Sequence, residues 1–406
     1  MKKALITSLL TVVAVMAATA SSVTFDYVSG IEGQRACLRL PNGDKEVKAL
    51  LYCHQNMTEE VLFRSERFTA AMDTLGVAMA FIQQGSQDWD VKKGCQERFE
   101  TIVTDFARAT DHPELAEAPV IPFGHSAQAT FPWNFAAWNP ERTLCIISFH
   151  GDAPRTNLCG YGRENIEWGR TRNIDRIPGL MVEGEYEWWE ARVRPALAFR
   201  MMYPESRISF LCDAGKGHFD LCEETQDYIA RFIAKSLADP RPEGGCHYPR
   251  WSEDGTESTD PHDMFWYHDE EMVALTRARY EESRGKEMQY LSARVNGDTI
   301  HYNADSHIKL NATIDPDAEF TVEPIFVDET RATECDAHAR VRPRVVIVSG
   351  PVIRTGDYTF RYDPEYFGAD PKRLWSGITL SIEADGDSTY KSAVQELNLR
   401  LQRNPR

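Results

Sequence analysis

Apolar and polar positions follow one pattern over the first half of the chain. From Ala36 to about Ala238, short apolar runs alternate with amphipathic stretches, which predicts a mostly parallel sheet with helices on both faces. Strands that are buried on both faces read as continuous apolar runs. The predicted strands are Ala36–Leu40, Lys48–Cys53, Val77–Ile82, Val120–Phe123, Leu144–Phe149, Gly179–Val182 and Ile208–Cys212. The two clearest amphipathic stretches, Glu97–Ala109 and Glu223–Ala238, are predicted helices.

The pattern changes after Ala238. Prolines and glycines interrupt the chain, and the acidic stretch to about His268 has no clear period, so we expect a linker there. The residues that follow predict an exposed, charged helix over Asp269–Arg284. From about Glu287 the pattern is that of strands alone, which predicts a small β-sandwich. Its strands are expected at Gln289–Val295, His307–Ile314, Glu319–Val327, Arg344–Val348, Asp357–Tyr362 and Ile378–Ala384.

The first residues of the chain have the pattern of a secretory signal. Lys2 and Lys3 precede an apolar run from Ala4 to Ala17, and the small residues of Ala18–Ala20 suit a signal peptidase. The run is shorter than the ~20 apolar residues that span a bilayer. We therefore predict a cleaved signal peptide and an exported protein, either periplasmic or secreted.

Length and pattern together predict more than one domain. A chain of 406 residues exceeds the usual size of one compact unit. We assign residues 1–20 to the signal peptide and 21–238 to an α/β catalytic domain. Residues 239–286 are assigned to a linker and helix, and 287–406 to a β-sandwich-like domain.

Charge and cysteine content narrow the possible partners. A formal net charge of −17 repels nucleic acid and anionic membrane surfaces, so neither is an expected partner. The nine cysteines form no CxxC pair and no zinc-type spacing with histidines, so we expect no metal and no cofactor. Cys212 and Cys222 bracket His218 and could form a disulfide that staples its loop.

Ser126 is the candidate nucleophile. The predicted strand Val120–Phe123 runs directly into Gly124–Ala129, and a helical stretch follows, which is the context of a nucleophile elbow. Such a turn lifts the serine hydroxyl above the sheet, and small neighbours permit its strained backbone. Gln128 departs from the motif, because it stands two residues after the serine, where a glycine is usual.

A serine hydroxyl needs a neighbouring base and a carboxylate that orients the base. His218 follows the last predicted strand of the sheet in a glycine-containing loop, and it is the candidate base. His125 is the alternative. The acid is expected between the serine and the histidine in the chain, where acidic residues follow the strand Gly179–Val182. Glu187 is the first candidate, and the alternatives are Glu185, Glu183 and Asp152.

Two backbone N–H groups should stabilise the oxyanion of an acyl-transfer reaction. Ala127, directly after the serine, is expected to supply one of them. The loop after Lys48–Cys53 should supply the other, from Gln55 or from Asn56. His54, in the same loop, either orients this loop or is an ordinary hydrogen-bonded residue.

Taken together, these residues resemble the α/β-hydrolase superfamily over about Ala36–Ala238, half of the chain. Similar domains include secreted carboxylesterases and the acetyl and feruloyl esterases of plant-polysaccharide breakdown. The resemblance implies a serine esterase that acts on a small-molecule or polysaccharide ester, with acetyl or hydroxycinnamoyl groups on carbohydrate as candidates. Because the fold hosts many activities, a serine peptidase and a catalytically inactive binding protein stay alternatives. The sequence leaves the oligomeric state open.

Overall fold

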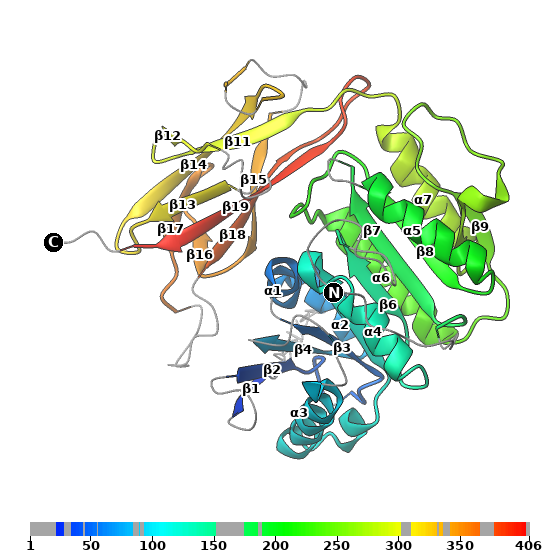
Figure 1. Cartoon of the computed structure of the whole chain (residues 1–406). Helices are drawn as coiled ribbons and strands as arrows, with labels where there is room; N and C mark the ends of the chain where they lie inside the picture. The colour runs from blue at the N-terminus through cyan, green and yellow to red at the C-terminus, as the bar shows by residue number, and fades with distance from the viewer. Residues whose placement is uncertain are drawn as a thin grey trace, which may run out of the picture.

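A computed structural model gives the architecture of the chain (Figure 1). The structure describes residues 22–27, 34–43, 45–54, 56–83, 89, 93–151, 174–185, 189–301, 310–330, 333–335, 342–365 and 377–402. The predicted signal peptide, residues 1–20, lies outside these ranges. In the part of the chain so described, no helix is long and apolar enough to cross a membrane.

One sheet of eight strands forms the centre of the N-terminal domain, which is the predicted catalytic domain. Its order is β1-β2-β4-β3-β5-β6-β7-β8. The six strands β3 to β8 run parallel to one another, whereas β1 pairs antiparallel with β2 and β2 pairs antiparallel with β4. The strands are β1 (Ser22–Tyr27), β2 (Gln34–Arg39), β3 (Ala49–His54), β4 (Val77–Gln83), β5 (Val120–His125), β6 (Ile146–Phe149), β7 (Pro178–Gly184) and β8 (Arg207–Asp213). This is the predicted α/β-hydrolase sheet, with β1 as an additional edge strand.

Helices cover both faces of this sheet, because successive side chains of a strand point to opposite faces. In β3, Leu50 packs in a core with Phe99, whereas Leu51 packs in a second core with Phe68 and Phe232. The helices are α1 (Met57–Arg64), α2 (Glu66–Leu75), α3 (Cys95–Thr110), α4 (Phe131–Trp138), α5 (Trp189–Met202) and α6 (Glu223–Ala238). Both helices predicted from amphipathic spacing are present, as α3 and α6.

The segment predicted as a linker is packed against the last strand of the sheet. It contains an antiparallel pair, β9 (Cys246–Pro249) and β10 (Met264–Tyr267), followed by α7 (Glu270–Ser283). The hydroxyl of Tyr267 donates to the carbonyl of Phe210 at 2.6 Å, and the hydroxyl of Tyr280 accepts from the N–H of Cys212 at 3.2 Å. These phenols bind backbone groups of β8 that an edge strand would otherwise leave to solvent.

The prediction that α7 is simply an exposed helix is wrong. Met272, Val273 and Tyr280 form a buried face on α7 and belong to the core of the catalytic domain. The sequence did not reveal this face for two reasons. Charged residues are abundant on the helix, and the buried side chains include a tyrosine and a threonine, so they do not form a purely aliphatic stripe.

The C-terminal part of the chain, from β11 onward, is a β-sandwich, as predicted (Figure 1). One sheet has the order β12-β11-β14-β17-β16 and the other β13-β19-β18-β15, and their inner faces share a single core that includes Phe320, Phe360 and Leu380. The strands are β11 (Tyr290–Val295), β12 (Asp298–Thr299), β13 (Leu310–Ile314), β14 (Glu319–Val327), β15 (Arg344–Ser349), β16 (Val352–Arg354), β17 (Thr359–Tyr362), β18 (Ile378–Ala384) and β19 (Ala393–Leu401).

Candidate active site

Ser126 stands in a strained turn between β5 and the short 3-10 helix Ser126–Gln128. Its φ is +55°, a left-handed conformation that non-glycine residues seldom adopt. A Cβ on Gly124 would lie 2.0 Å from the carbonyl oxygen of Gln128, so this position requires glycine. Gln128 itself is buried and is accommodated within the turn. The departure from the usual glycine therefore leaves the elbow intact.

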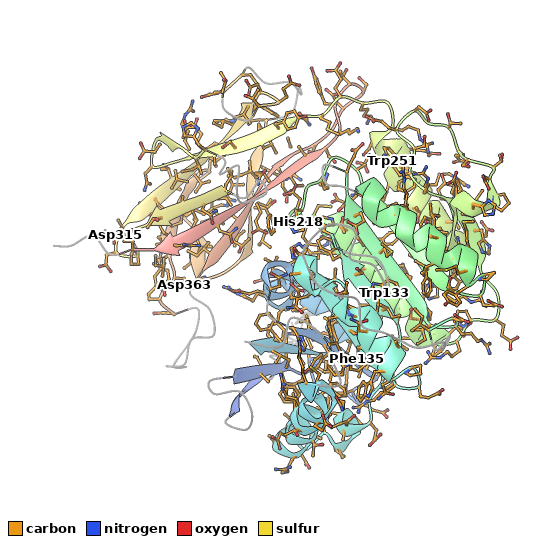
Figure 2. All side chains as sticks on the ribbon, in the orientation of Figure 1. Trp133, Phe135, His218, Trp251, Asp315 and Asp363 are labelled. Atoms are coloured by element: carbon orange, nitrogen blue, oxygen red, sulfur yellow. The ribbon has the colours of Figure 1, made fainter. Side chains whose placement is uncertain are left out.

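His218 lies beside this serine. Its Nε2 is 2.7 Å from the Oγ of Ser126, a hydrogen bond between residues that are 92 positions apart in the chain. His218 comes from the loop between β8 and α6, where the N–H of Gly217 donates to the carboxylate of Asp220 at 2.7 Å. In Figure 2, His218 is on the side of the catalytic domain that faces the β-sandwich. The structure thus brings together the predicted nucleophile and base.

Two further histidines hold the backbone of this base. The Nε2 of His125 and the Nδ1 of His150 each lie 2.9 Å from the carbonyl oxygen of His218. Because a carbonyl only accepts, both ring nitrogens must carry a proton. His125, the alternative base, therefore directs its Nε2 at the backbone of His218. Sequence reasoning missed His150, although it directly follows the predicted strand Leu144–Phe149.

Helix α1 holds the peptide units around His125. The N–H of His125 donates to Oε1 of Glu59 at 2.6 Å, and the Nδ2 of Asn56 donates to the carbonyl of His125 at 2.7 Å. Glu59 is fully buried, and its Oε2 has no hydrogen-bond partner among the described residues. Burial raises the pKa of Glu59 to about 8, although the hydrogen bond from His125 opposes this shift. Glu59 is a second site residue that the sequence did not reveal.

The acid candidates have different positions. Glu187 and Asp152 lie outside the described residues. Glu183 is fully buried in β7, and its Oε1 accepts from the N–H of Gly151 at 3.3 Å. Glu185 accepts from the N–H of Gly215 at 2.8 Å and from Lys391 at 2.8 and 3.0 Å. Both of its oxygens are therefore engaged by Gly215 and Lys391.

The predicted oxyanion donors lie around the same elbow. Ala127 follows Ser126 in the 3-10 helix and is half-buried. Gln55 lies outside the described residues, and Asn56 uses its side chain to hold His125. His54 is buried and stacks on the ring of Phe131, with 4.5 Å between the ring centroids. This packing is compatible with either of its predicted roles.

The disulfide that Cys212 and Cys222 could have formed is absent, because both are free thiols. Cys222 lies directly before α6, with its Sγ 3.0 Å from the Oγ1 of Thr225. Burial raises the pKa of Cys222 to about 12, so the protonated thiol is retained at neutral pH. The loop of His218 is instead held by hydrogen bonds and by the ion pair that involves Glu185.

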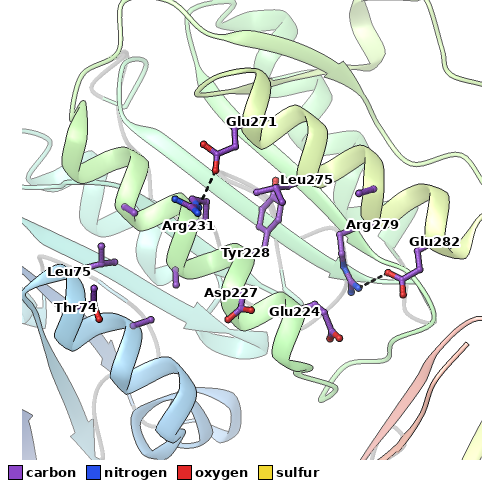
Figure 3. A pocket seen from close by; sticks show the side chains of 14 residues that line it. Thr74, Leu75, Glu224, Asp227, Tyr228, Arg231, Glu271, Leu275, Arg279 and Glu282 are labelled. Carbon is purple, nitrogen blue, oxygen red and sulfur yellow. Dashed lines mark hydrogen bonds and ion pairs between the residues drawn. The ribbon is translucent and has the colours of Figure 1, made fainter. Parts of the chain in front are cut away.

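The cavities lined by described residues include two that border the predicted catalytic domain and contain neither Ser126 nor His218. One of them, about 660 Å³, lies between α2, α6 and α7; the ion pair Arg231–Glu271 joins α6 to α7 there, and the pair Arg279–Glu282 lies along α7 (Figure 3). The other, about 420 Å³, lies between the catalytic domain and the β-sandwich and includes Leu221, three residues after the base. Among the described residues, no group of three or more His, Cys, Asp or Glu side chains could hold a metal ion.

No protein-family model matches the chain, and no curated protein matches it. Solved structures that resemble it include the serine hydrolase FphF from Staphylococcus aureus (14% identity, 54% of this chain, 99% of that chain, TM-score 0.39). Est1E from Butyrivibrio proteoclasticus is 17% identical over 54% of this chain and 99% of that chain, with a TM-score of 0.37. A feruloyl esterase module from Clostridium thermocellum is 11% identical over 54% of this chain and 87% of that chain, with a TM-score of 0.38. Similarity of this degree carries no information about substrate, so function is inferred below from the residues of this chain.

Proposed function

We propose that the protein is a serine hydrolase that cleaves carboxylic esters through an acyl-enzyme. The observation that carries this proposal is the 2.7 Å contact between Ser126 Oγ and His218 Nε2 at a residue with φ of +55°. A strained serine at a strand-to-helix turn, in hydrogen-bond contact with a histidine from the loop after the last strand, is suited to nucleophilic catalysis.

The proposed reaction has two steps. In the first, the Oγ of Ser126 bonds to the acyl carbon while its proton moves to His218, which then passes that proton to the departing alcohol. In the second, water gives a proton to His218 and attacks the acyl carbon; the bond from this carbon to the Oγ of Ser126 then breaks, and His218 returns the proton to Oγ as the acid leaves. The N–H groups of Ala127 and Gln55 would stabilise the oxyanion, and Glu187 would orient the imidazole.

Acetyl or hydroxycinnamoyl esters on carbohydrate are the proposed substrates, and the enzyme is proposed to be exported. Cleavage after Ala20 would leave the sheet complete, because β1 begins at Ser22. If export follows this course, the mature protein recovered from outside the cytoplasm begins at Ser21 when its N-terminus is determined by mass spectrometry. Recovery of intact residues 1–20 in that fraction would contradict the proposal.

The central test compares the mature enzyme with its Ser126→Ala variant. On 4-nitrophenyl acetate, longer acyl esters, a methyl ferulate and acetylated xylan, the variant should lose kcat by ~10⁶-fold. It should also lose labelling by a fluorophosphonate. Ser252→Ala, in a surface turn, is the control and should keep both activities. Equal turnover by wild type and Ser126→Ala would overturn the proposal.

The same assays separate the alternatives. Cleavage of peptide amides without ester preference would identify a peptidase, and inertness of the folded wild type towards every ester and the fluorophosphonate would identify a binding protein. Glu187→Ala and Asp152→Ala assign the acid, because the variant that loses about 10⁴-fold in kcat with an intact fold has lost the orienting carboxylate.

A further inference from the structure

The β-sandwich touches the catalytic domain at the loops that carry its catalytic side chains. We propose that Lys391 of the sandwich is a positioning residue for catalysis, which fixes the loop of His218 through Glu185. This inference rests on the proposed function, and it assigns a role to the sandwich that the resemblance to hydrolases does not provide.

Glu185 is the point at which three segments meet. Its carboxylate accepts from the N–H of Gly215, in the loop after β8, at 2.8 Å. The same carboxylate binds the Nζ of Lys391, in the turn between β18 and β19, at 2.8 and 3.0 Å. Glu185 itself directly follows β7. One carboxylate therefore joins the ends of two catalytic strands to the sandwich.

The ion pair is withdrawn from solvent. The side chain of Lys391 is 1% exposed and that of Glu185 is 5% exposed. The Nζ of Lys391 also lies 3.7 Å from Oε1 of Glu253, but the side chain of Glu253 is 68% exposed. Removal of Lys391 leaves the charge of Glu185 without compensation in a poorly solvating environment. A contact of this kind holds its partners in one geometry, which an exposed pair of flexible side chains does not.

Lys391 is itself rigidly placed within the sandwich. Its N–H donates to the carbonyl of Glu287 at 2.8 Å, and its carbonyl accepts from the Nε2 of Gln289 at 2.6 Å. Both partners directly precede β11, so the segment that leads into the first strand of the sandwich holds the turn that carries the lysine. The ammonium group is thus presented from a fixed backbone.

The loop after β8 fits closely against the same turn. A Cβ on Gly215 would lie 2.7 Å from the carbonyl oxygen of Ser392, so only glycine allows this approach. The next residue, Lys216, is buried and donates its Nζ to the carbonyl and the hydroxyl of Ser392, at 3.2 and 3.1 Å. The base His218 lies two residues further along.

These contacts predict a catalytic effect and not only a stabilising one. His218 follows Gly215 by three residues, and the proposed acid Glu187 follows Glu185 by two. Loss of the ion pair would let both loops shift relative to Ser126. Displacement of reacting groups by about 1 Å can cost ~10²-fold in rate.

The experiment measures full-length Lys391→Met with 4-nitrophenyl acetate and with a fluorophosphonate, together with its thermal unfolding. We expect kcat and the labelling rate to fall by about a hundredfold, with KM nearly unchanged. Arg344→Met is the matched control: it breaks ion pairs to Glu383 and Asp385 that stay within the sandwich, so kcat should be retained.

A double variant separates positioning from stability. Glu185→Gln combined with Lys391→Met removes both charges, and the amide oxygen introduced at position 185 can still accept from the N–H of Gly215. The melting temperature of the double variant should therefore recover towards that of wild type. If kcat stays low in this variant, the ion pair positions the loops. A kcat equal to that of wild type in either folded variant would overturn the inference. If Lys391→Met does not fold, the kcat of the double variant provides the test. Equal activity of wild type and Ser126→Ala would instead refute the proposed function itself.

Discussion

The carbonyl oxygen of His218 accepts hydrogen bonds from two buried histidines, His125 and His150, each at 2.9 Å. This arrangement predicts that His150→Leu lowers kcat by about tenfold, since the loss of one buried hydrogen bond costs on the order of 1 kcal/mol. His125 would still hold the carbonyl in this variant. Steady-state kinetics on 4-nitrophenyl acetate test this, with His262→Leu, at an exposed position, as control. Unchanged kcat in His150→Leu would show that His125 suffices.

Glu59 predicts a pH dependence of stability. Because burial raises its pKa from 4.5 to about 8, the folded protein keeps this proton where the unfolded chain has released it. The stabilisation is complete below pH 4.5 and is lost as the pH rises towards 8, by about 1.4 kcal/mol per pH unit. Glu59→Gln lacks this term and still offers an oxygen to His125. The difference in melting temperature, Glu59→Gln minus wild type, should therefore increase from pH 5 to pH 8. If the two melting temperatures change in parallel with pH, Glu59 does not have the raised pKa.

At the scale of single residues, the sequence predicted those catalytic candidates whose order along the chain is fixed by the fold. Ser126 and His218 each follow a buried strand in the order that the fold imposes, so motif and placement identified them. His150 and Glu59 carry no such motif. Their roles depend on side-chain directions across the sheet, and these directions become fixed only when the strands and α1 pack together.

Helix α7 is tied to the end of β8 by a buried ion pair. The Nη2 of Arg279 lies 2.7 Å from Oδ1 of Asp213, which is fully buried and also accepts from the Oγ1 of Thr225 at 2.6 Å. Arg279→Met would leave this carboxylate without its counter-ion, and we expect a loss of about 3 kcal/mol in the free energy of unfolding. Arg277→Met, on the same helix but half-exposed, should cost less than about 1 kcal/mol.

Denaturation by guanidinium chloride, followed by circular dichroism, compares these two arginine variants. Equal losses would mean that α7 depends on its general charge and not on the pair with Asp213. A large loss in Arg279→Met alone supports the ion pair as the link between α7 and β8.

At the scale of elements, strong local patterns were predicted and short or mixed ones were not. β14, β18 and α6 have the predicted bounds, because apolar and polar residues alternate with a clear period along their sequences. β9 and β10 have four residues each, and they depend on packing against β8 that no local pattern encodes. β19 was missed although Leu397, Leu399 and Leu401 alternate with polar residues, since the preceding polar stretch obscured this period.

At the scale of the molecule, the resemblance covered half of the chain and left the sandwich without a role. Its contacts with the catalytic domain join residues far apart in sequence, such as Lys391 with Glu185, 206 positions away. Arg64 of α1 likewise donates to the carbonyl of Gly377 at 3.2 Å. Polar contacts of this kind have no sequence signature, because each partner alone reads as an ordinary surface residue.

The net charge of −17 predicts how the whole molecule responds to salt. Folding brings like charges together, so self-repulsion destabilises the compact state. Screening shortens the range of this repulsion from about 30 Å at 0.01 M salt to about 8 Å at 0.15 M. Surface ion pairs such as Arg67–Asp227 weaken as well, but each contributes little.

We therefore expect the melting temperature to rise by a few degrees between 0.01 and 0.3 M sodium chloride, measured by differential scanning fluorimetry at pH 7. The buried pair Lys391–Glu185 is shielded from the added ions, so Lys391→Met should show a rise of similar size from a lower starting value. A fall in melting temperature with salt would mean that attraction between surface charges outweighs the repulsion expected from the net charge. If the melting temperature rises with salt in wild type but not in Lys391→Met, then repulsion between the predicted catalytic domain and the sandwich lowers the melting temperature only when the ion pair holds the two domains together.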